Sequence, residues 1–182
     1  NPALKFSVSS YDGEGGFPAN VTISCLYLLT NDGQLVIKHE AIGDKDTVMN
    51  ITNHSYFNLS GDYKTTILDH QLILDCDKYV EIDDNLIPTG NLLPTENTPF
   101  DFSSFHSIGE RIEDTPFGYD HTLCFSDWSK QLSKVGVFKC DRSKIQMEIY
   151  TTLPSLQLYS GNFISENDIN KDGSKGLKNG GI

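Results

Sequence analysis

The chain has 182 residues and a formal net charge of −11 at pH 7, with 37% hydrophobic and 10% aromatic residues. This length and composition suit a globular protein with a hydrophobic core and exclude a disordered chain. The acidic balance argues against nucleic acid as a partner, and no run approaches the roughly 20 apolar residues that a membrane helix needs.

The first half of the chain shows the strongest strand pattern. Apolar and polar residues alternate over residues 21–27 and 35–41, and Asn31-Asp32-Gly33 between them is typical of a hairpin turn. Val48–Thr52 follow as an apolar run, which we interpret as a short strand that leads into His54.

Later strands are shorter. Residues 72–74 and 79–82 are candidates on either side of an acidic turn. Residues 135–138 and 145–149 frame Asp141-Arg142-Ser143-Lys144, which predicts a second hairpin.

Helical periodicity is almost absent, and only residues 105–114 are expected to hold a short helical turn. Strands at this spacing with frequent turns predict an all-β fold, a large antiparallel β-sandwich. Because the chain shows no internal repeat and no low-complexity linker, we expect a single domain over residues 1–182.

The four cysteines lie far apart, at Cys25, Cys76, Cys124 and Cys140, and form no CxxC pair. This spacing argues against a zinc site and suits reduced thiols. The first residues show no basic leader followed by an apolar stretch, so we expect a cytoplasmic protein.

The most informative segment is Thr52–Gly61, with the sequence TNHSYFNLSG. A histidine flanked by amides, a hydroxyl and aromatic rings suits a proton donor beside a polyhydroxyl ligand. The alternative is a structural histidine at a strand end, packed under a turn.

Three motifs, in order, carry a family resemblance. Thr52–Gly61 resembles the histidine motif of the aldose 1-epimerases, or galactose mutarotases. Phe117–His121 is similar to the aspartate motif of that family, and Tyr150–Phe163 to its glutamine-bearing strand and turn. The connecting stretches Gly16–Asn20 and Leu86–Gly90 also match.

The resemblance implies a β-sandwich whose sugar cleft lies on one sheet face. It also implies interconversion of the α- and β-anomers of D-glucose or D-galactose, with a hexose as partner and no metal or nucleotide cofactor. We expect a monomer that binds neither nucleic acid nor a membrane.

The same resemblance assigns roles to five residues. His54 would be the general acid, Asp120 and Gln157 would hold sugar hydroxyls, and Ser55 and Tyr56 would line the site. The alternatives are a turn-capping aspartate, a surface glutamine on a strand, and ordinary packing for Ser55 and Tyr56.

The remaining histidines are expected to lie outside the site. His121 follows Asp120, and adjacent strand residues point to opposite faces. His39, His70 and His106 match no motif, which favours surface or structural positions.

The family's base is a glutamate in a Gly-aromatic-Cys-Leu-Glu type of segment, and Gly180-Gly181-Ile182 resembles the start of that segment. Glu148 and Glu166 do not match it. We therefore expect a fragment that covers roughly the second half of a family member without its final strands, inactive by itself.

Two other functions stay open. A non-catalytic carbohydrate-binding protein would use the same fold, because fold alone does not determine function. A relative that acts on sugar phosphates would carry added Arg or Lys around the three motifs, and these motifs contain neither residue.

Overall fold

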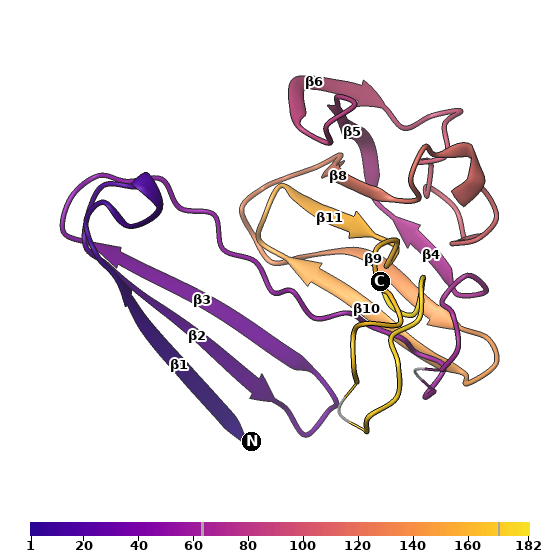
Figure 1. Ribbon diagram of the computed structural model, residues 1–182, viewed down its shortest axis with the longest axis horizontal. Coiled ribbons are helices and arrows are strands. Elements are labelled where there is room, and N and C mark those ends of the chain that lie inside the picture. Colours follow the sequence, from indigo (N-terminus) through magenta and orange to yellow (C-terminus); the bar gives the residue numbers. More distant parts are fainter. Residues whose placement is uncertain (63, 171) are drawn as a thin grey trace. The chain divides into compact units, whose positions relative to one another are not determined.

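The computed structural model describes residues 1–62, 64–170 and 172–182, and within them the chain forms strands, turns and two short 3₁₀ segments but no α-helix. It divides into two compact units, Asn1–Ser55 and Tyr56–Ile182 (Figure 1). The single domain expected over residues 1–182 stays a prediction.

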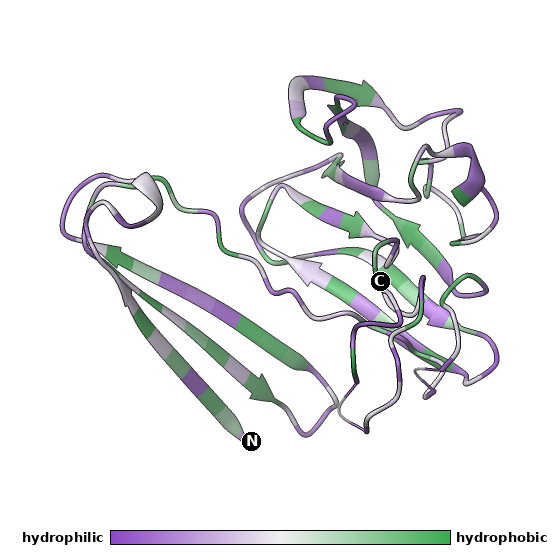
Figure 2. Ribbon diagram, viewed as in Figure 1, coloured by the Kyte–Doolittle hydropathy of each residue, from purple (hydrophilic) through white to green (hydrophobic). Residues whose placement is uncertain are grey.

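The first unit is a three-stranded antiparallel sheet. Its strands, in spatial order, are β1 (Ala3–Ser10), β2 (Val21–Leu29) and β3 (Leu35–Gly43), with the 3₁₀ segment η1 (Glu14–Gly16) after β1. The predicted hairpin of β2 and β3 is confirmed, with Leu29 opposite Leu35 at its turn. In Figure 2 the middle of β3 is hydrophilic, and there Glu40 contacts Lys38 at 3.3 Å and Lys5 of β1 at 3.6 Å.

The second unit contains two four-stranded antiparallel sheets. One has the order β10-β9-β4-β7 and the other β11-β8-β5-β6. Their bounds are β4 (Gln71–Leu74), β5 (Cys76–Ile82), β6 (Pro88–Pro94), β7 (His106–Ser107), β8 (Asp120–Phe125), β9 (Ser133–Cys140), β10 (Ile145–Thr151) and β11 (Ser155–Tyr159). The predicted hairpin at residues 141–144 joins β9 and β10.

One hydrophobic cluster is shared by both sheets of the second unit. Leu72 of β4 and Phe138 of β9 enter it from one sheet, and Leu123 of β8 and Leu158 of β11 enter it from the other. Each of these side chains is almost fully buried. Two sheets that share one core make a sandwich, so the predicted all-β, antiparallel fold class is confirmed.

Two local predictions need correction. Val48–Thr52 is not a strand, because an extended segment becomes one only when a neighbouring strand pairs its backbone groups, and here no ladder forms. The helical turn expected within residues 105–114 shortens to the 3₁₀ segment η2 (Ile112–Asp114), preceded by the two-residue strand β7.

The four cysteines are free, and Cys76 and Cys140 are buried. Burial raises the pKa of the Cys76 thiol to about 12, which keeps it protonated and unreactive at neutral pH. In the part of the chain that the structure describes, no helix has the length and apolar character to cross a membrane.

Candidate functional site

A short turn presents His54 at the end of the first unit. The Asn53 side chain donates from Nδ2 to the Tyr27 hydroxyl of β2 (2.9 Å) and accepts at Oδ1 from the Ser55 backbone N–H (3.0 Å). An asparagine that bonds the backbone two residues ahead closes an Asx-turn. His54 is therefore the central residue of a turn that is tied to the sheet, and both His54 and Ser55 are exposed.

In the second unit, Asp120 and Gln157 lie in direct contact. Gln157 donates from Nε2 to Asp120 Oδ1 (2.8 Å), although the two residues are 37 positions apart in sequence. The contact follows from the pairing of β8 with β11, which sets Thr122 opposite Gln157 and Asp120 opposite Tyr159. The structure thus brings together the two residues that the resemblance assigns to sugar hydroxyls.

The pairing also separates the site from the core. On β8 the buried residues are His121, Leu123 and Phe125, whereas Asp120, Thr122 and Cys124, which alternate with them, stay partly exposed. Side chains alternate between faces along a strand, so the polar residues share the outer face. The alternatives, Asp120 as a turn cap and Gln157 as a surface residue on a strand, stay open, because Gln157 is exposed and this contact fits them as well.

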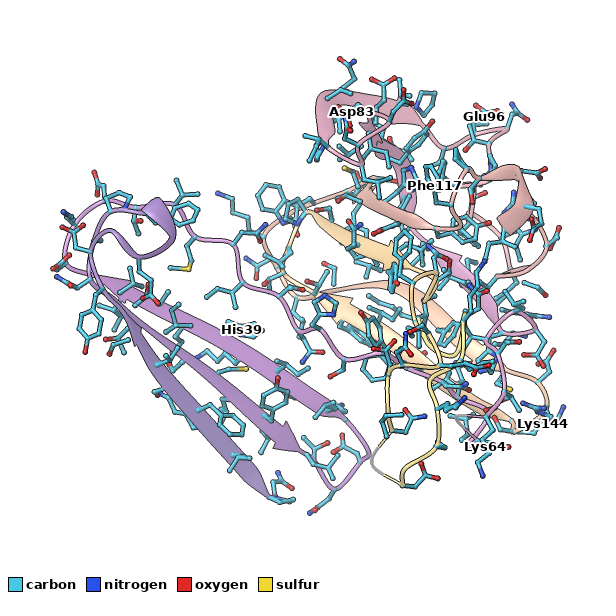
Figure 3. The ribbon with its side chains drawn as sticks, in the orientation of Figure 1. His39, Lys64, Asp83, Glu96, Phe117 and Lys144 are labelled. Atoms are coloured by element: carbon cyan, nitrogen blue, oxygen red, sulfur yellow. The ribbon has the colours of Figure 1, made fainter. Side chains whose placement is uncertain are left out.

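A glycine turn carries the chain into β8. Gly118 has a φ of +80°, which favours glycine, and a Cβ there would overlap with the Asn162 side chain. Asn162 in turn donates from Nδ2 to the Tyr119 carbonyl at 2.8 Å. The aspartate motif and the glutamine motif are therefore joined at their turns as well as along their strands. Phe117, labelled in Figure 3, is exposed beside this turn.

Aromatic side chains lie next to the polar pair. The Tyr56 and Tyr159 rings are 5.6 Å apart between centroids, and the Phe163 ring stacks on Tyr159 at 6.4 Å. Burial raises the pKa of the Tyr56 hydroxyl, and the negative charge of Asp120 acts in the same direction. Apolar ring faces beside a carboxylate and an amide suit a polyhydroxyl ligand.

Sequence reasoning missed Tyr159, Phe163 and Thr122 as parts of this surface. Tyr159 and Phe163 belong to the glutamine motif, and two-residue spacing places Tyr159 on the same face as Gln157. Thr122 belongs to no motif, and its position becomes apparent only from the strand register. A small hollow beside it is lined by Asp120, Thr122, Gln157, Val80, Ile82, Leu86 and Pro88.

The last described residues pair with the histidine motif. The Phe57 N–H donates to the Ile182 carbonyl (2.8 Å), and the Ile182 N–H donates to the Phe57 carbonyl (3.0 Å). A Cβ on Gly181 would lie 2.8 Å from the Tyr56 Cβ, so this close approach favours glycine. Residues 181 and 182 therefore run directly beside Tyr56 and Phe57.

Two other histidines have structural surroundings. His121 is buried against the Phe100 ring, with 4.3 Å between centroids. It therefore faces away from the Asp120 side chain, as the alternation of strand residues predicted. His70 is fully buried and accepts at Nε2 from the Leu59 backbone N–H (3.1 Å).

Within residues 1–62, 64–170 and 172–182, metal-ligating side chains do not gather near this surface. Among the residues that the structure describes, no three His, Cys, Asp or Glu side chains are grouped so that they could hold a metal ion.

A family model described as aldose 1-epimerase matches residues 1–179. The chain belongs to the aldose 1-epimerase family. It is 34% identical over 180 residues to the galactose mutarotase of Homo sapiens, covering 98% of this chain and 50% of that protein. It is 36% identical over 167 residues to the aldose 1-epimerase of Escherichia coli (strain K12), covering 87% of this chain and 47% of that protein.

A solved structure agrees with the family assignment. The crystal structure of a GalM/aldose epimerase homologue from C. elegans superposes with a TM-score of 0.87 at 29% identity, covering 98% of this chain and 54% of that one. The chain spans about half the length of the curated relatives it matches. That it represents the second half of such a protein stays a prediction.

We predict that His121 makes the stability of the second unit pH-dependent. Burial lowers the pKa of His121, opposed by the charge of Asp120. The unfolded pKa of about 6.5 is then the higher one, so the unfolded chain binds the proton more tightly. His121 therefore contributes stability above about pH 6.5, and this contribution is lost as the pH falls toward the folded pKa.

Denaturant unfolding, followed by the fluorescence of the single tryptophan Trp128, measures this effect. Between about pH 7.5 and about pH 5.5, His121→Phe should lose less free energy of unfolding than the wild type. The half-buried, Glu110-paired His106 provides the control His106→Gln. Equal losses for wild type and His121→Phe would contradict the prediction.

Proposed function

We propose that the whole protein that carries this chain interconverts the α- and β-anomers of D-glucose or D-galactose by acid–base catalysis. The observation that carries the proposal is the Asp120–Gln157 hydrogen bond, placed on the outer face of β8 and β11 beside the Tyr56–Tyr159 rings. Family membership and the exposed turn around His54 support it.

The reaction needs two proton transfers. A base takes the proton of the anomeric hydroxyl while an acid protonates the ring oxygen, and the C1–O5 bond breaks to give the open-chain aldehyde. Rotation about the C1–C2 bond exposes the other face of the carbonyl. The reverse transfers then close the ring with the opposite configuration. One acid and one base are sufficient.

His54 is the proposed acid. An imidazole exchanges protons near neutral pH, which suits a group that must give a proton and take it back in each turnover. The turn that Asn53 closes holds the backbone on both sides of His54 and ties it to Tyr27 of β2. The imidazole is thereby presented from an anchored segment, and Ser55 directly follows it as a lining residue.

Asp120 and Gln157 are the proposed sugar-holding pair. After Gln157 bonds Oδ1, the second carboxylate oxygen of Asp120 remains to accept from a sugar hydroxyl, and the amide has a second N–H to donate. Tyr56 contributes a ring beside them. Charged acceptors bond hydroxyls more strongly than neutral ones, so Asp120 would carry most of the binding.

The base is proposed to be a carboxylate outside residues 1–182. Glu148 contacts Lys134 and accepts from the Tyr150 hydroxyl, and Glu166 contacts Lys175 at 2.7 Å, so both carboxylates are held by surface partners. Residues 180–182 resemble the start of the family's base-bearing segment. Because Ile182 pairs with Phe57, a residue that directly follows it would lie near Phe57.

The preferred substrates in this proposal are neutral hexoses. The net charge of −11 and the absence of Arg and Lys from the three motifs would repel a sugar phosphate or leave it without a partner. A cytoplasmic monomer without cofactor belongs to the same proposal.

We predict that His54→Gln in the whole protein lowers kcat by roughly 10²- to 10⁴-fold and changes sugar binding little, because a general acid acts in the transition state. Polarimetry on freshly dissolved α-D-glucose gives the rate, and isothermal titration gives the affinity. His106→Gln is the matched control on a histidine outside the motifs. Near-normal turnover of His54→Gln would rule out His54 as the acid.

We predict that Asp120→Ala mainly weakens sugar binding. A charge-assisted hydrogen bond contributes about 1.5–3 kcal/mol, so KM should rise about 10- to 150-fold. Asp127→Ala, at an exposed aspartate in the loop after β8, serves as the control. Unchanged KM and kcat in Asp120→Ala would show that Asp120 has only a local structural role.

We predict that the 182-residue chain by itself is nearly inactive, whereas the whole protein accelerates mutarotation. The proposed base would be missing, and orientation of the sugar by the rest of the protein would be lost with it. Comparable polarimetric rates for both would mean that a carboxylate within residues 1–182 is the base. A whole protein that binds hexose without changing the mutarotation rate would be a carbohydrate-binding protein instead.

A further inference from the structure

We propose that Thr122 is a positioning residue, whose hydroxyl holds the Gln157 amide in the one orientation that serves the sugar. This inference rests on the proposed function and extends it to a residue outside the three motifs.

The geometry forms a relay of two hydrogen bonds across the β8–β11 pair. Thr122 donates from Oγ1 to Gln157 Oε1 (2.7 Å), and Gln157 donates from Nε2 to Asp120 Oδ1 (2.8 Å). Thr122 lies directly opposite Gln157, and Asp120 is two residues before Thr122 on the same face. Both ends of one amide are therefore held by one neighbouring strand.

The carboxylate, the amide and the hydroxyl determine which group donates and which accepts in each of the two hydrogen bonds. An ionised carboxylate only accepts hydrogen bonds, so the amide must turn its N–H end toward Asp120. The carbonyl end then faces Thr122, whose hydroxyl can donate or accept and here must donate. A flipped amide would bring its oxygen against the Asp120 carboxylate, where two acceptors repel each other.

The second bond matters because the terminal torsion of glutamine is broad. A single bond to Asp120 leaves the amide plane free to turn about that contact. The Thr122 bond removes this freedom before a sugar arrives, so binding does not have to restrict the side chain. The remaining Gln157 N–H and the free Asp120 oxygen then keep one mutual arrangement.

The surroundings of Thr122 favour this role. A β-branched side chain on a strand has few χ1 states, so the hydroxyl direction is well defined. Thr122 lines the small hollow whose wall includes Val80 and Ile82 of β5, and these apolar neighbours suit its methyl group. Valine has the same shape and lacks the hydroxyl, which makes Thr122→Val a nearly isosteric test.

Steady-state polarimetry on the whole protein, with D-galactose and D-glucose, tests the proposal. Thr122→Val should raise KM about 3- to 10-fold, the effect of one lost orienting hydrogen bond, with kcat within about twofold of wild type. Thr122→Ser keeps the hydroxyl and should restore KM. Thr22→Val, the same change at an exposed strand threonine of the first unit, is the matched control.

A double-mutant cycle separates positioning from direct contact. If Thr122 acts through Gln157, Thr122→Val should add nothing to the KM of Gln157→Ala. Additive effects would mean that Thr122 touches the sugar independently, and they would overturn the inference. A loss that Thr122→Ser fails to recover would do the same, because it would indicate a packing role.

Two further results distinguish this inference from the proposed function. A normal KM in Thr122→Val, with a raised KM in Gln157→Ala, would overturn the inference and leave the proposed function intact. A normal KM in both Gln157→Ala and Asp120→Ala would refute the sugar-holding pair, and the inference would fail with it. Should Thr122→Val not fold, Thr122→Ala carries the same expectations.

Discussion

The register between β8 and β11 decides which side chains of the candidate site meet. Leu158 lies opposite His121 and points into the core, so Gln157, Thr122 and Asp120 must point outward together. A shift by one residue would bury the carboxylate and expose the core leucine, which makes the register strongly specified. Burial of Leu123 and Leu158 in the core therefore stabilises the register that places Thr122, Gln157 and Asp120 together on the opposite face.

Contacts of the turns next to β8 and β11 also stabilise that register. The positive φ of Gly118 and the bond from Asn162 to the Tyr119 carbonyl join the two strands just outside the ladder. The ring of Tyr159, the last residue of β11, contacts the ring of Tyr56. Phe57, which follows Tyr56, pairs with Ile182 through backbone hydrogen bonds. Segments from three distant parts of the sequence therefore meet around Tyr56 and Phe57.

Much of the fold was predictable because long runs of alternating apolar and polar residues favour strands. The hairpin of β2 and β3 follows directly from residues 21–27, 35–41 and the Asn-Asp-Gly turn. β1 shows the same alternation at Leu4, Phe6 and Val8, so this strand was predictable in the same way. Val48–Thr52 has the apolar content of a strand but forms none, because apolar content alone does not provide a pairing partner.

For the candidate site, the sequence predicts individual residues but not which of them are in contact. A motif identifies Asp120 and Gln157, but their contact depends on pairing across 37 positions, which local pattern does not encode. Thr122 could not be predicted from local sequence either, because this strand threonine becomes part of the site only by lying opposite Gln157 on β11. Tyr159 was accessible in principle, since it shares the face of Gln157 by two-residue spacing.

We propose that the whole protein moves only the protons of the anomeric hydroxyl and the ring oxygen of a hexose held at Asp120 and Gln157. Two-dimensional exchange NMR on equilibrated D-galactose in D₂O tests it most directly. We expect exchange cross-peaks between the anomeric protons that strengthen with protein concentration, with the C1–H and C2–H signals fully retained. Exchange no faster than in buffer, or loss of the C2–H signal through deuterium uptake, would contradict it.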